Sequence, residues 1–318
     1  MLDTSHLRVR PHRVTMNGHI ESGLLGAVEA GGTKINLAVG STSAEILDSA
    51  RIETTTPEST AAGILEFFSP YRDRLLAFGV ASFGPVRLDT TAPDWGRLLT
   101  TPKAGWSGAS FVDPLISAFC LPVALETDVN AAALAEQHSG SLRGTRSGAY
   151  ITVGTGIGGG FIADNFVIHG RMHPEFGHVR VLRTLAGDDD FAGCCPYHGD
   201  CLEGLASGSA IQRRWGASLS ELPSDHAAHE LVADYIGQAC ATLALTLSPE
   251  RIVIGGGVAN APGFHRAIGA RMRSWLCGYL TDRDLLGGGF VVPPELGDQA
   301  GLVGAMLLAA RISERSRP

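Results

Sequence analysis

Two strand–glycine loop–strand patterns, about 125 residues apart, most constrain the fold of this 318-residue chain. In the first, the apolar run from Leu24 leads into Gly31-Gly32-Thr33-Lys34 and continues as Ile35 to Val39. In the second, Ala149 to Val153 leads into Gly154-Thr155-Gly156 and then Ile157 to Ile162. Each pattern predicts a β-hairpin with a tight loop. The recurrence predicts an internal duplication, one copy per lobe, against the alternative that two glycine turns are alike by chance.

Strand-like and helix-like segments alternate after each hairpin, which predicts an α/β fold. The expected strands are Phe78 to Phe83, Pro122 to Leu125 and Arg251 to Ile254, and the expected helices are Ala131 to Gln137, Glu230 to Leu247 and Ala300 to Ile312. We expect a mixed sheet in each lobe and a cleft between the lobes.

Composition limits the possible partners. The chain is 44% hydrophobic, which supports a sizeable core, and its net charge of −7 argues against nucleic acid as a partner. No apolar stretch approaches the length of a membrane span, and residues 1–22 lack the apolar core of a secretory signal. Six cysteines, three of them in one short segment, favour a metal site in a reducing compartment over a disulfide framework. We therefore expect a cytoplasmic protein with no membrane partner and a disordered tail over residues 1–22.

The run Cys195-Pro-Tyr-His198-Gly-Asp-Cys201 places three metal-binding side chains at close spacing in a turn-prone stretch. His178, upstream of this run, can supply a fourth ligand. Two histidines and two cysteines match the tetrahedral preference of zinc, and a closed set of four leaves no open position for catalysis. We predict a structural zinc site, against the alternative that these are unrelated loop residues or that His178 only satisfies a hydrogen bond in the core.

Two carboxylates flank the predicted zinc site. Glu175 lies three residues before His178, and Glu203 lies two residues after Cys201. A metal that closes this loop would fix the positions of both acids.

The two glycine loops are predicted to bind phosphate. Glycine lets the backbone approach a phosphate closely, and the loops at Gly31, Gly32, Thr33 and Lys34 and at Thr155 and Gly156 offer N–H groups beside a Thr hydroxyl. Neither loop has the spacing of a Walker A motif. Gly255-Gly256-Gly257, at the end of a strand, and Gly297 to Gly301, before a helix, suit an adenosine lying against bare backbone. Close packing of helix and strand is the alternative, above all for the second of these loops.

Asp128 is the candidate catalytic base. It follows a strand and starts a helix, whose N-terminus favours the ionised carboxylate, so we expect it to be charged at neutral pH. A weakly basic carboxylate can still orient a hydroxyl and take its proton late, which the loose transition state of phosphoryl transfer permits. The alternative is that Asp128 is only the N-cap of the helix.

Together these motifs resemble the sugar kinases of the ROK family, in particular their bacterial fructokinase-type branch. The resemblance covers about Leu24 to Ile312. The motifs that carry it are Glu29-Ala-Gly-Gly-Thr-Lys34, Phe83-Gly-Pro85, Thr101-Pro-Lys-Ala-Gly-Trp106, Thr127-Asp-Val-Asn-Ala-Ala132, Val153-Gly-Thr-Gly-Ile-Gly158, His173-Pro-Glu-Phe-Gly-His178 and Cys195 to Glu203. The resemblance implies the two-lobed actin-like ATPase (ribonuclease H-like) fold, closing over ATP and a sugar.

The resemblance also implies roles for particular residues. Asp128 would act on the 6-hydroxyl of a hexose. The sugar would be bound by Glu175, His178, Glu203, Asn130 and the Gly84-Pro85 turn. The two glycine loops would face the phosphates of ATP, and Gly255, Gly256 and Gly257 would lie on its nucleoside side. Magnesium would arrive with ATP, zinc would be structural, and the protein would form a homodimer.

The chain departs from the family pattern at two positions. Glu29 stands where many members have Asp, which leaves open whether it meets Mg²⁺ directly or through water. His198 replaces one thiolate of the usual cysteine-rich zinc motif, although the resulting ligand set still suits zinc.

From these motifs we predict an N-terminal lobe at 23–125 completed by the helix 300–314, and a C-terminal lobe at 126–299 that contains a zinc-binding loop at 175–203. The predicted activity is that of a fructokinase, which makes fructose 6-phosphate from fructose and ATP. A mannokinase or glucokinase of the same family is the nearest alternative. A sugar-responsive repressor is disfavoured because only about 22 residues precede the first motif. A non-catalytic sugar-binding module would leave the two phosphate loops unexplained.

Overall fold

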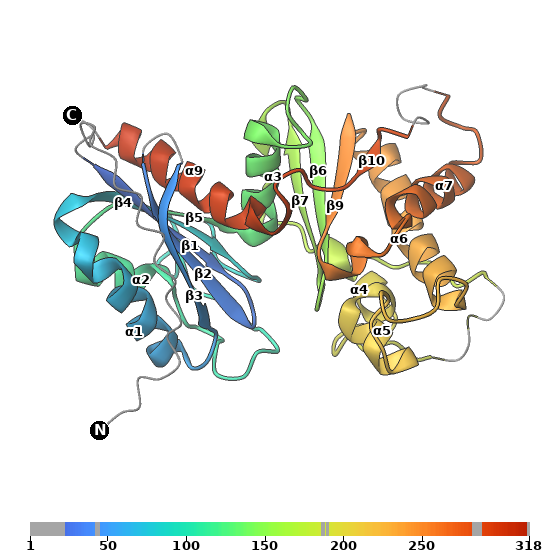
Figure 1. Ribbon diagram of the computed structural model, residues 1–318, viewed down its shortest axis with the longest axis horizontal. Helices are drawn as coiled ribbons and strands as arrows, with labels where there is room; N and C mark the ends of the chain where they lie inside the picture. Colours follow the sequence, from blue (N-terminus) through green and yellow to red (C-terminus); the bar gives the residue numbers. More distant parts are fainter. Residues whose placement is uncertain (1–22, 42–44, 186–187, 189–190, 282–287, 317–318) are drawn as a thin grey trace.

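The structure is a computed structural model that describes residues 23–41, 45–185, 188, 191–281 and 288–316. The tail predicted at 1–22 lies outside the described residues. The two lobes lie side by side, each built on one five-stranded sheet (Figure 1).

The sheet of the first lobe has the order β3-β2-β1-β4-β5. Its strands are β1 (Leu24–Ala30), β2 (Lys34–Gly40), β3 (Ile46–Glu53), β4 (Leu75–Ser82) and β5 (Val123–Thr127). Strands β1, β2 and β3 pair in antiparallel fashion, and β1, β4 and β5 are parallel. One face is covered by α1 (Pro57–Phe68) and α2 (Val112–Phe119), with the short helix η1 (Ser69–Arg74) between α1 and β4.

The sheet of the second lobe repeats this topology in the order β10-β9-β6-β7-β8. Its strands are β6 (Gly148–Val153), β7 (Ile157–Ala163), β8 (Phe166–Val167), β9 (Arg251–Gly255) and β10 (Val291–Val292). Strands β6, β7 and β8 are antiparallel, while β6, β9 and β10 are parallel. The predicted duplication is therefore confirmed at the level of topology, because β6 to β10 occupy the places of β1 to β5.

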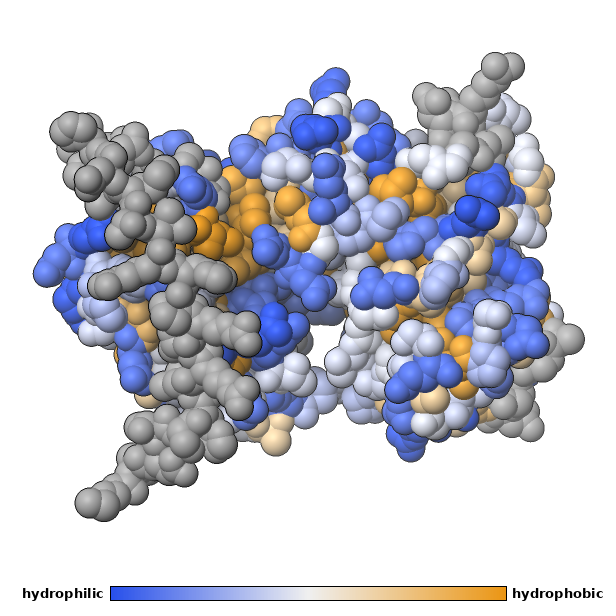
Figure 2. Space-filling view, in the orientation of Figure 1, coloured by the Kyte–Doolittle hydropathy of each residue, from blue (hydrophilic) through white to orange (hydrophobic). Residues whose placement is uncertain are grey.

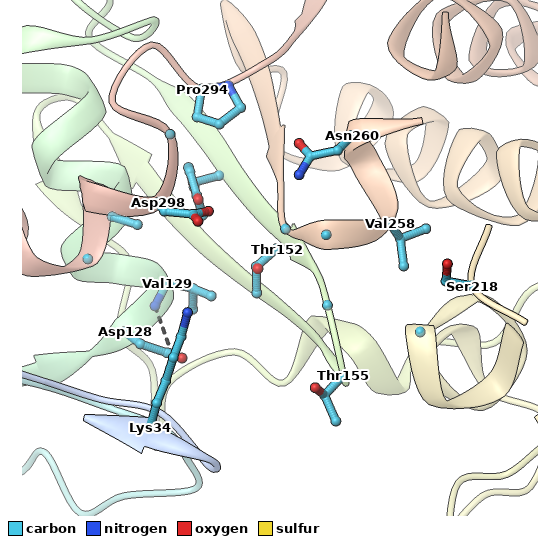
Figure 3. A pocket seen from close by; sticks show the side chains of 18 of the residues that line it. Lys34, Asp128, Val129, Thr152, Thr155, Ser218, Val258, Asn260, Pro294 and Asp298 are labelled. Carbon is cyan, nitrogen blue, oxygen red and sulfur yellow. Dashed lines mark hydrogen bonds between the residues drawn. The ribbon is translucent and has the colours of Figure 1, made fainter. Parts of the chain in front are cut away.

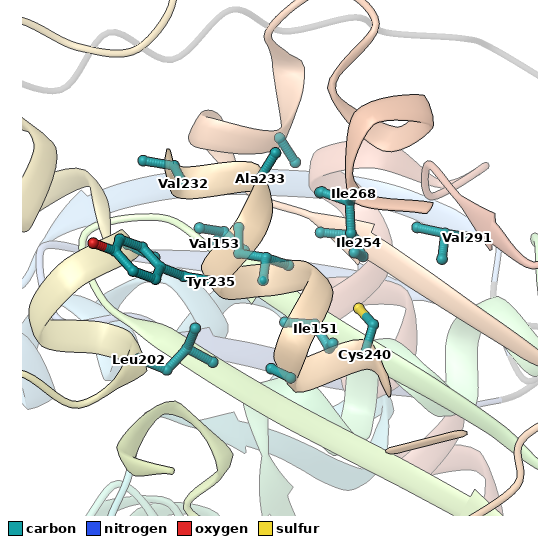
Figure 4. Packing of buried hydrophobic residues seen from close by; sticks show 14 of the residues in the cluster. Ile151, Val153, Leu202, Val232, Ala233, Tyr235, Cys240, Ile254, Ile268 and Val291 are labelled. Atoms are coloured by element: carbon teal, nitrogen blue, oxygen red, sulfur yellow. The ribbon is translucent and has the colours of Figure 1, made fainter. Parts of the chain in front are cut away.

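The outer face of the second sheet is covered by helices. They are α6 (Ala227–Thr246) and α7 (Phe264–Leu276), with α4 (Leu202–Ala206) and α5 (Gly208–Trp215) beside them, and the remaining short helices are η2 (Phe176–His178), η3 (Gly257–Asn260) and η4 (Gly297–Gln299). Helix α6 is predicted as amphipathic, but it is buried along most of its length. Tyr235 and Cys240 of α6 belong to the same buried cluster as Ile151 of β6 and Ile254 of β9 (Figure 4).

Two helices lie between the sheets, and each follows one sheet but packs on the other (Figure 1). Helix α3 (Asp128–Ser139) leaves β5 of the first sheet and packs on the second sheet. Helix α9 (Ala300–Arg315) follows β10 of the second sheet and packs on the first. The two helices meet where Gly304 lies against the backbone of Ala131.

On this packing we propose the lobe boundaries given above, with α9 completing the N-terminal lobe and α3 belonging to the C-terminal one. The space-filling view shows a deep opening between the two lobes, bordered by hydrophilic residues (Figure 2). Among the described residues, no helix is both long and apolar enough to cross a membrane.

The crossing of α3 and α9 generates a stability prediction. A Cβ atom at Gly304 would collide with the carbonyl oxygen of Ala131, whereas one at Gly269 of α7 would come no closer than 3.4 Å to the Arg273 side chain. We expect Gly304→Ala to destabilise the protein by about 1–3 kcal/mol through overpacking. Gly269→Ala, the matched helical control, should be neutral or stabilise by up to about 1 kcal/mol. Urea unfolding of both variants would contradict this interpretation if Gly304→Ala were the more stable of the two.

Candidate active site

A cavity of about 790 Å³ lies between the lobes and receives side chains from both of them (Figure 3). Lys34 enters from β2 of the first lobe, while Thr152 and Thr155 enter from β6 and the loop after it. The wall also includes Glu29, Asn36, Asp128, Tyr150, Gln212, Ser218, Gly256, Gly257, Asn260, Pro294, Asp298 and Gly301.

The structure brings part of the predicted phosphate-binding set to this cavity. Lys34, Thr155, Gly256 and Gly257 line it, together with Asp128. Gly31, Gly32, Thr33, Gly156 and Gly255 are not among its lining residues, although Thr33, Gly156 and Gly255 each adjoin one that is. A hydrogen bond from the Thr54 hydroxyl to the Gly31 carbonyl (2.8 Å) holds the loop at Gly31 in place.

Several lining residues carry no sequence signal of a site. Asn36, Tyr150, Gln212, Ser218 and Asn260 are single polar residues within ordinary strands, helices or loops. Only the fold brings them to one cavity, so the sequence reasoning missed them.

Asp128 is the first residue of α3, and Thr127 is the N-cap of that helix, since the N–H of Asn130 donates to the Thr127 hydroxyl (3.2 Å). The alternative in which Asp128 serves only as the cap is therefore wrong. Its Oδ1 accepts a hydrogen bond from the N–H of Val129 (2.9 Å). The first turn of α3 reaches this position because Gly160 of β7 has no side chain to collide with the carbonyl of Val129.

Burial raises the pKa of Asp128 to about 7, with smaller contributions from the nearby carboxylates of Glu29 and Glu175. The expectation of a low pKa is wrong for this structure, because desolvation outweighs both the helix N-terminus and the Val129 hydrogen bond. A carboxyl group with a pKa near 7 is a stronger base than an ordinary aspartate and is still half ionised at neutral pH.

Three further acids stand near Asp128. Burial raises the pKa of Glu29. Burial, with the neighbouring Glu203 as a second cause, raises the pKa of Glu175 to about 7, although 44% of the Glu175 side chain is exposed. Glu29 comes from the first lobe, and the other acids, Glu175 and Glu203, come from the segment 175–203 of the second. The site therefore gathers several carboxyl groups beside the cavity.

The Gly84-Pro85 turn of the first lobe contacts the motif His173 to His178 of the second. The N–H of Val86 donates to Nε2 of the buried His173 (3.1 Å), and Nδ1 of His173 lies 3.5 Å from Oε1 of Glu175. Burial lowers the pKa of His173, which favours a neutral ring whose Nδ1–H faces Glu175. A Cβ atom at Gly84 would lie 3.0 Å from the His173 ring, so glycine permits this approach.

Asn130 lies in the first turn of α3, and Glu126 holds its side chain. The amide of Asn130 donates to Oε1 of Glu126 (2.9 Å), whose other oxygen lies 2.8 Å from Nε2 of His169. This hydrogen bond raises the pKa of His169. The amide oxygen of Asn130 is buried and has no hydrogen-bond partner among the described residues. A buried acceptor of this kind suits a hydroxyl group of a ligand.

His178, Cys195, His198 and Cys201 form one cluster, with all four ligand atoms within 4.8 Å of one another. Nδ1 of His178 lies 3.7 Å from Sγ of Cys195 and 3.6 Å from Sγ of Cys201, and Nδ1 of His198 lies 3.6 Å from Sγ of Cys195. A tetrahedron with Zn–S of about 2.3 Å and Zn–N of about 2.0–2.1 Å has sulfur–nitrogen edges of about 3.6 Å. The residues present therefore fit a tetrahedral metal of zinc's preference.

The local backbone explains how the cluster assembles. Cys195 and Gly199 exchange hydrogen bonds across a tight turn, and Gly199 takes a positive φ of 64°. Gly204 packs against the carbonyl of Gly199, where a side chain would collide. Cys194 lies outside the four-residue cluster, although its backbone N–H donates to the carbonyl of Gly204 (3.0 Å).

Glu203 joins the metal cluster to the second glycine loop. The N–H of Ile157 donates to Oε2 of Glu203 (2.9 Å), and the N–H of Gly208 donates to the carbonyl of Gly154 (2.7 Å). The Ser209 hydroxyl also donates to the carbonyl of Thr155 (2.8 Å). The helices that follow Cys201 therefore hold the loop that is predicted to bind phosphate.

Two lobes with duplicated sheets, joined by crossing helices and enclosing a cavity lined by glycine loops and acids, define an actin-like ATPase fold. The sequence matches the ROK family over residues 25–312, and the chain belongs to that family of proteins.

Known relatives cover most of the chain. A fructokinase of Zymomonas mobilis is 44% identical over 90% of this chain and 96% of that protein, and a fructokinase of Pediococcus pentosaceus is 39% identical over 90% and 97%. The crystal structure of a ROK family glucokinase from Streptomyces griseus, in complex with glucose and AMPPNP, has a TM-score of 0.72 and 29% identity, and covers 91% of this chain and 100% of that one.

The raised pKa of Asp128 generates a prediction about stability and pH. A group whose pKa is higher in the folded than in the unfolded protein stabilises the fold at low pH, and this stability is lost as the pH rises to the folded value. Asp128→Asn removes this titrating group. The stability of the variant relative to the wild type should therefore increase from about pH 4 to about pH 7. Above about pH 7 the Tm of the variant should stay about 1–3 °C above that of the wild type. Thermal unfolding at pH 5 and pH 8 measures this gain, and a smaller gain at pH 8 than at pH 5 would contradict the assignment.

Proposed function

We propose that the protein is an ATP-dependent fructokinase, which converts D-fructose and ATP into D-fructose 6-phosphate and ADP. The observation that carries this proposal is the position of Asp128, between the large cavity and the acid-rich sugar motifs, with its pKa raised to about 7. The identity of the sugar is supported by relatives named as fructokinases, at 44% and 39% identity.

In the proposed reaction, Asp128 orients the 6-hydroxyl of the sugar and takes its proton as the oxygen attacks the γ-phosphorus of ATP. The bond from the γ-phosphorus to the β–γ bridging oxygen breaks, and ADP leaves with that oxygen. Little covalent chemistry is asked of the protein in such a transfer, because positioning and charge stabilisation supply most of the rate. A base of pKa near 7 holds the proton until it is released to solvent.

The sugar would lie on the side of Asp128 that faces Asn130, Glu175 and Glu203. The unpartnered amide oxygen of Asn130 would accept from one hydroxyl, and the two glutamates would accept from others. His178 faces the metal cluster through Nδ1, which leaves Nε2 for the sugar. The Gly84-Pro85 turn would close the pocket from the first lobe.

ATP would enter as its magnesium complex and occupy the large cavity. Lys34 and Thr155 would face the phosphates, with Gly31, Gly32, Thr33 and Gly156 supplying the loops behind them. Gly255, Gly256 and Gly257 would lie under the nucleoside, where Gly256 takes a positive φ of 89°.

We propose that zinc occupies the cluster of His178, Cys195, His198 and Cys201 and is structural. When bound, it would hold the loop that carries Glu175 and Glu203. The further proposal of a homodimer rests on family membership alone, and that of a cytoplasmic location rests on family membership and on the cysteine usage of the sequence.

Mannokinase or glucokinase activity is the second candidate. The glucokinase of Streptomyces griseus is more distant, at 29% identity, than the fructokinases. A coupled assay over fructose, mannose and glucose tests the choice directly. We expect kcat/KM to be largest for fructose, and a larger value for glucose would reject the fructose assignment.

The base assignment predicts the kinetics of one variant. Asp128→Asn should lower kcat by about 10²–10⁴-fold, because the general base is removed while its volume is kept. Asp164→Asn is the matched control, since Asp164 is exposed and pairs with Arg146 on the surface. In the wild type, kcat/KM should fall about tenfold per pH unit below pH 7 and level off above it, since the base must be ionised. If Asp128→Asn kept a kcat within tenfold of the wild type, Asp128 would be ruled out as the base.

The metal assignment predicts one zinc per chain, measured by elemental analysis of the purified protein. Cys201→Ser should lose most of this zinc and lower Tm by roughly 5–10 °C. It should also raise KM for both fructose and ATP, because Glu203 connects the cluster to the loop at Ile157. Cys194→Ser is the control and should retain the metal. Fully active protein without zinc would contradict the structural role.

A further inference from the structure

Three polar side chains form a row across the first three strands of the first sheet. Glu29 of β1 lies opposite Asn36 of β2, and Asn36 lies opposite Arg51 of β3. The Asn36 amide donates to Oε2 of Glu29 (2.6 Å), and Nε of Arg51 donates to Oδ1 of Asn36 (2.9 Å). The three residues therefore form a continuous hydrogen-bonded chain from the cavity wall to the exposed edge strand.

The position of this row is unusual for its face of the sheet. Leu25 and Ala27 precede Glu29 on the same face of β1, and Ala38 follows Asn36 on β2, since side chains alternate along a strand. These three residues are buried under α9. The face becomes polar only where α9 begins and the cavity opens. Burial raises the pKa of Glu29, so holding a carboxylate here has an energetic cost that packing alone does not explain.

Gly301 makes room for the glutamate. A Cβ atom at Gly301, in the first turn of α9, would collide with Oε1 of Glu29. Glu29 and Gly301 both line the cavity, together with Lys34 and Asp298. One carboxylate oxygen is thus held by Asn36, and the other lies beside a residue with no side chain at the wall of the nucleotide cavity.

Arg51 fixes which end of the Asn36 amide faces Glu29. An amide can present either its oxygen or its NH₂ group, and only the NH₂ group can donate to a carboxylate. Because Arg51 donates to the amide oxygen, the NH₂ group is turned towards Glu29. The charge of Arg51 also favours the ionised form of Glu29, because it lowers the pKa of that carboxyl group. The Asn36 hydrogen bond and the charge of Lys34 lower it as well.

We propose that Asn36 and Arg51 are positioning residues for MgATP, which hold the Glu29 carboxylate ionised and oriented so that its free oxygen faces the metal–phosphate group. This inference rests on the proposed function and assigns a positioning role to two residues, Asn36 at the cavity wall and Arg51 behind it. It also explains how a glutamate replaces a shorter aspartate at this position, because the added length is taken up between Asn36 and Gly301.

Arg51→Met provides the sharpest test, since Arg51 is exposed and its removal leaves the core intact. We expect the affinity for Mg·AMPPNP to fall about 3–10-fold in isothermal titration, which corresponds to loss of one hydrogen bond in a charged network. The affinity of Arg51→Met for AMPPNP without metal should stay within twofold of the wild-type value, and its Tm should stay within about 1 °C of the wild-type Tm. In the coupled assay, KM for MgATP should rise while KM for fructose is unchanged.

Two further variants serve as a stronger perturbation and as a control. Asn36→Leu removes both hydrogen bonds and should weaken Mg·AMPPNP binding more than Arg51→Met does. Ser49→Ala is the matched control, because Ser49 lies on the same face of β3 two residues from Arg51 and is also exposed. It should leave nucleotide binding and Tm unchanged.

The outcomes separate this inference from the proposed function. If Arg51→Met lowered Tm without changing the metal-dependent part of nucleotide affinity, the row would be only structural and the inference would be wrong. If Arg51→Met and Asn36→Leu both bound Mg·AMPPNP like the wild type, it would also be wrong. Failure of the wild type to phosphorylate any hexose would instead reject the proposed function, while the titrations would still test the role of Asn36 and Arg51.

Discussion

The contact between α3 and α9 is the constraint on which the geometry of the site depends. The backbone of α9 at Gly304 lies directly against the carbonyl of Ala131, and no side chain separates the two helices there. Asp128 begins α3, and Gly301, one turn before the contact, lies beside Glu29. Asp128 of the second lobe and Glu29 of the first are therefore both positioned by a single helix crossing. Glu136 strengthens the same joint, since its buried carboxylate accepts from the N–H groups of Glu295 and Leu296 just before α9.

The carboxylates gathered at this joint oppose folding, because each is partly desolvated and they repel one another. The structure holds them by separate means. Asn36 donates to Glu29, and the N–H groups of Val129 and Ile157 donate to Asp128 and Glu203. Glu175 lies within the loop that the metal cluster closes. Zinc bound to that cluster would offset part of the repulsion without touching the reacting groups, which is why a closed ligand set suits this position.

Much of this could be predicted from the sequence, because the glycine hairpins and the Cys-x2-His-x2-Cys run carry their signals in adjacent residues. The prediction was wrong for the ionisation of Asp128, since a helix N-terminus is visible in the sequence but the burial of the carboxylate in the folded protein is not. The strand expected at Ile157 to Ile162 is confirmed as β7, but the sequence does not show that its glycines Gly158 and Gly160 make room for the first turn of α3. Asn36 and Tyr150 were missed because each acquires its role only from partners distant in sequence.

The duplicated halves explain why the two sides of the cleft differ in chemistry. The shared topology supplies one glycine hairpin to each lobe, and the departures from it lie in two long connections. One runs from β4 to α2 and contains the Gly84-Pro85 turn, and the other runs from β8 to α6 and contains the metal cluster. These connections meet across the cleft where the N–H of Val86 donates to His173, beside Glu175. The choice of sugar would depend on these two connections. The second connection also supplies Gly208, Ser209 and Gln212 to the cavity proposed for ATP, so a change of sugar through it would act on the nucleotide side as well.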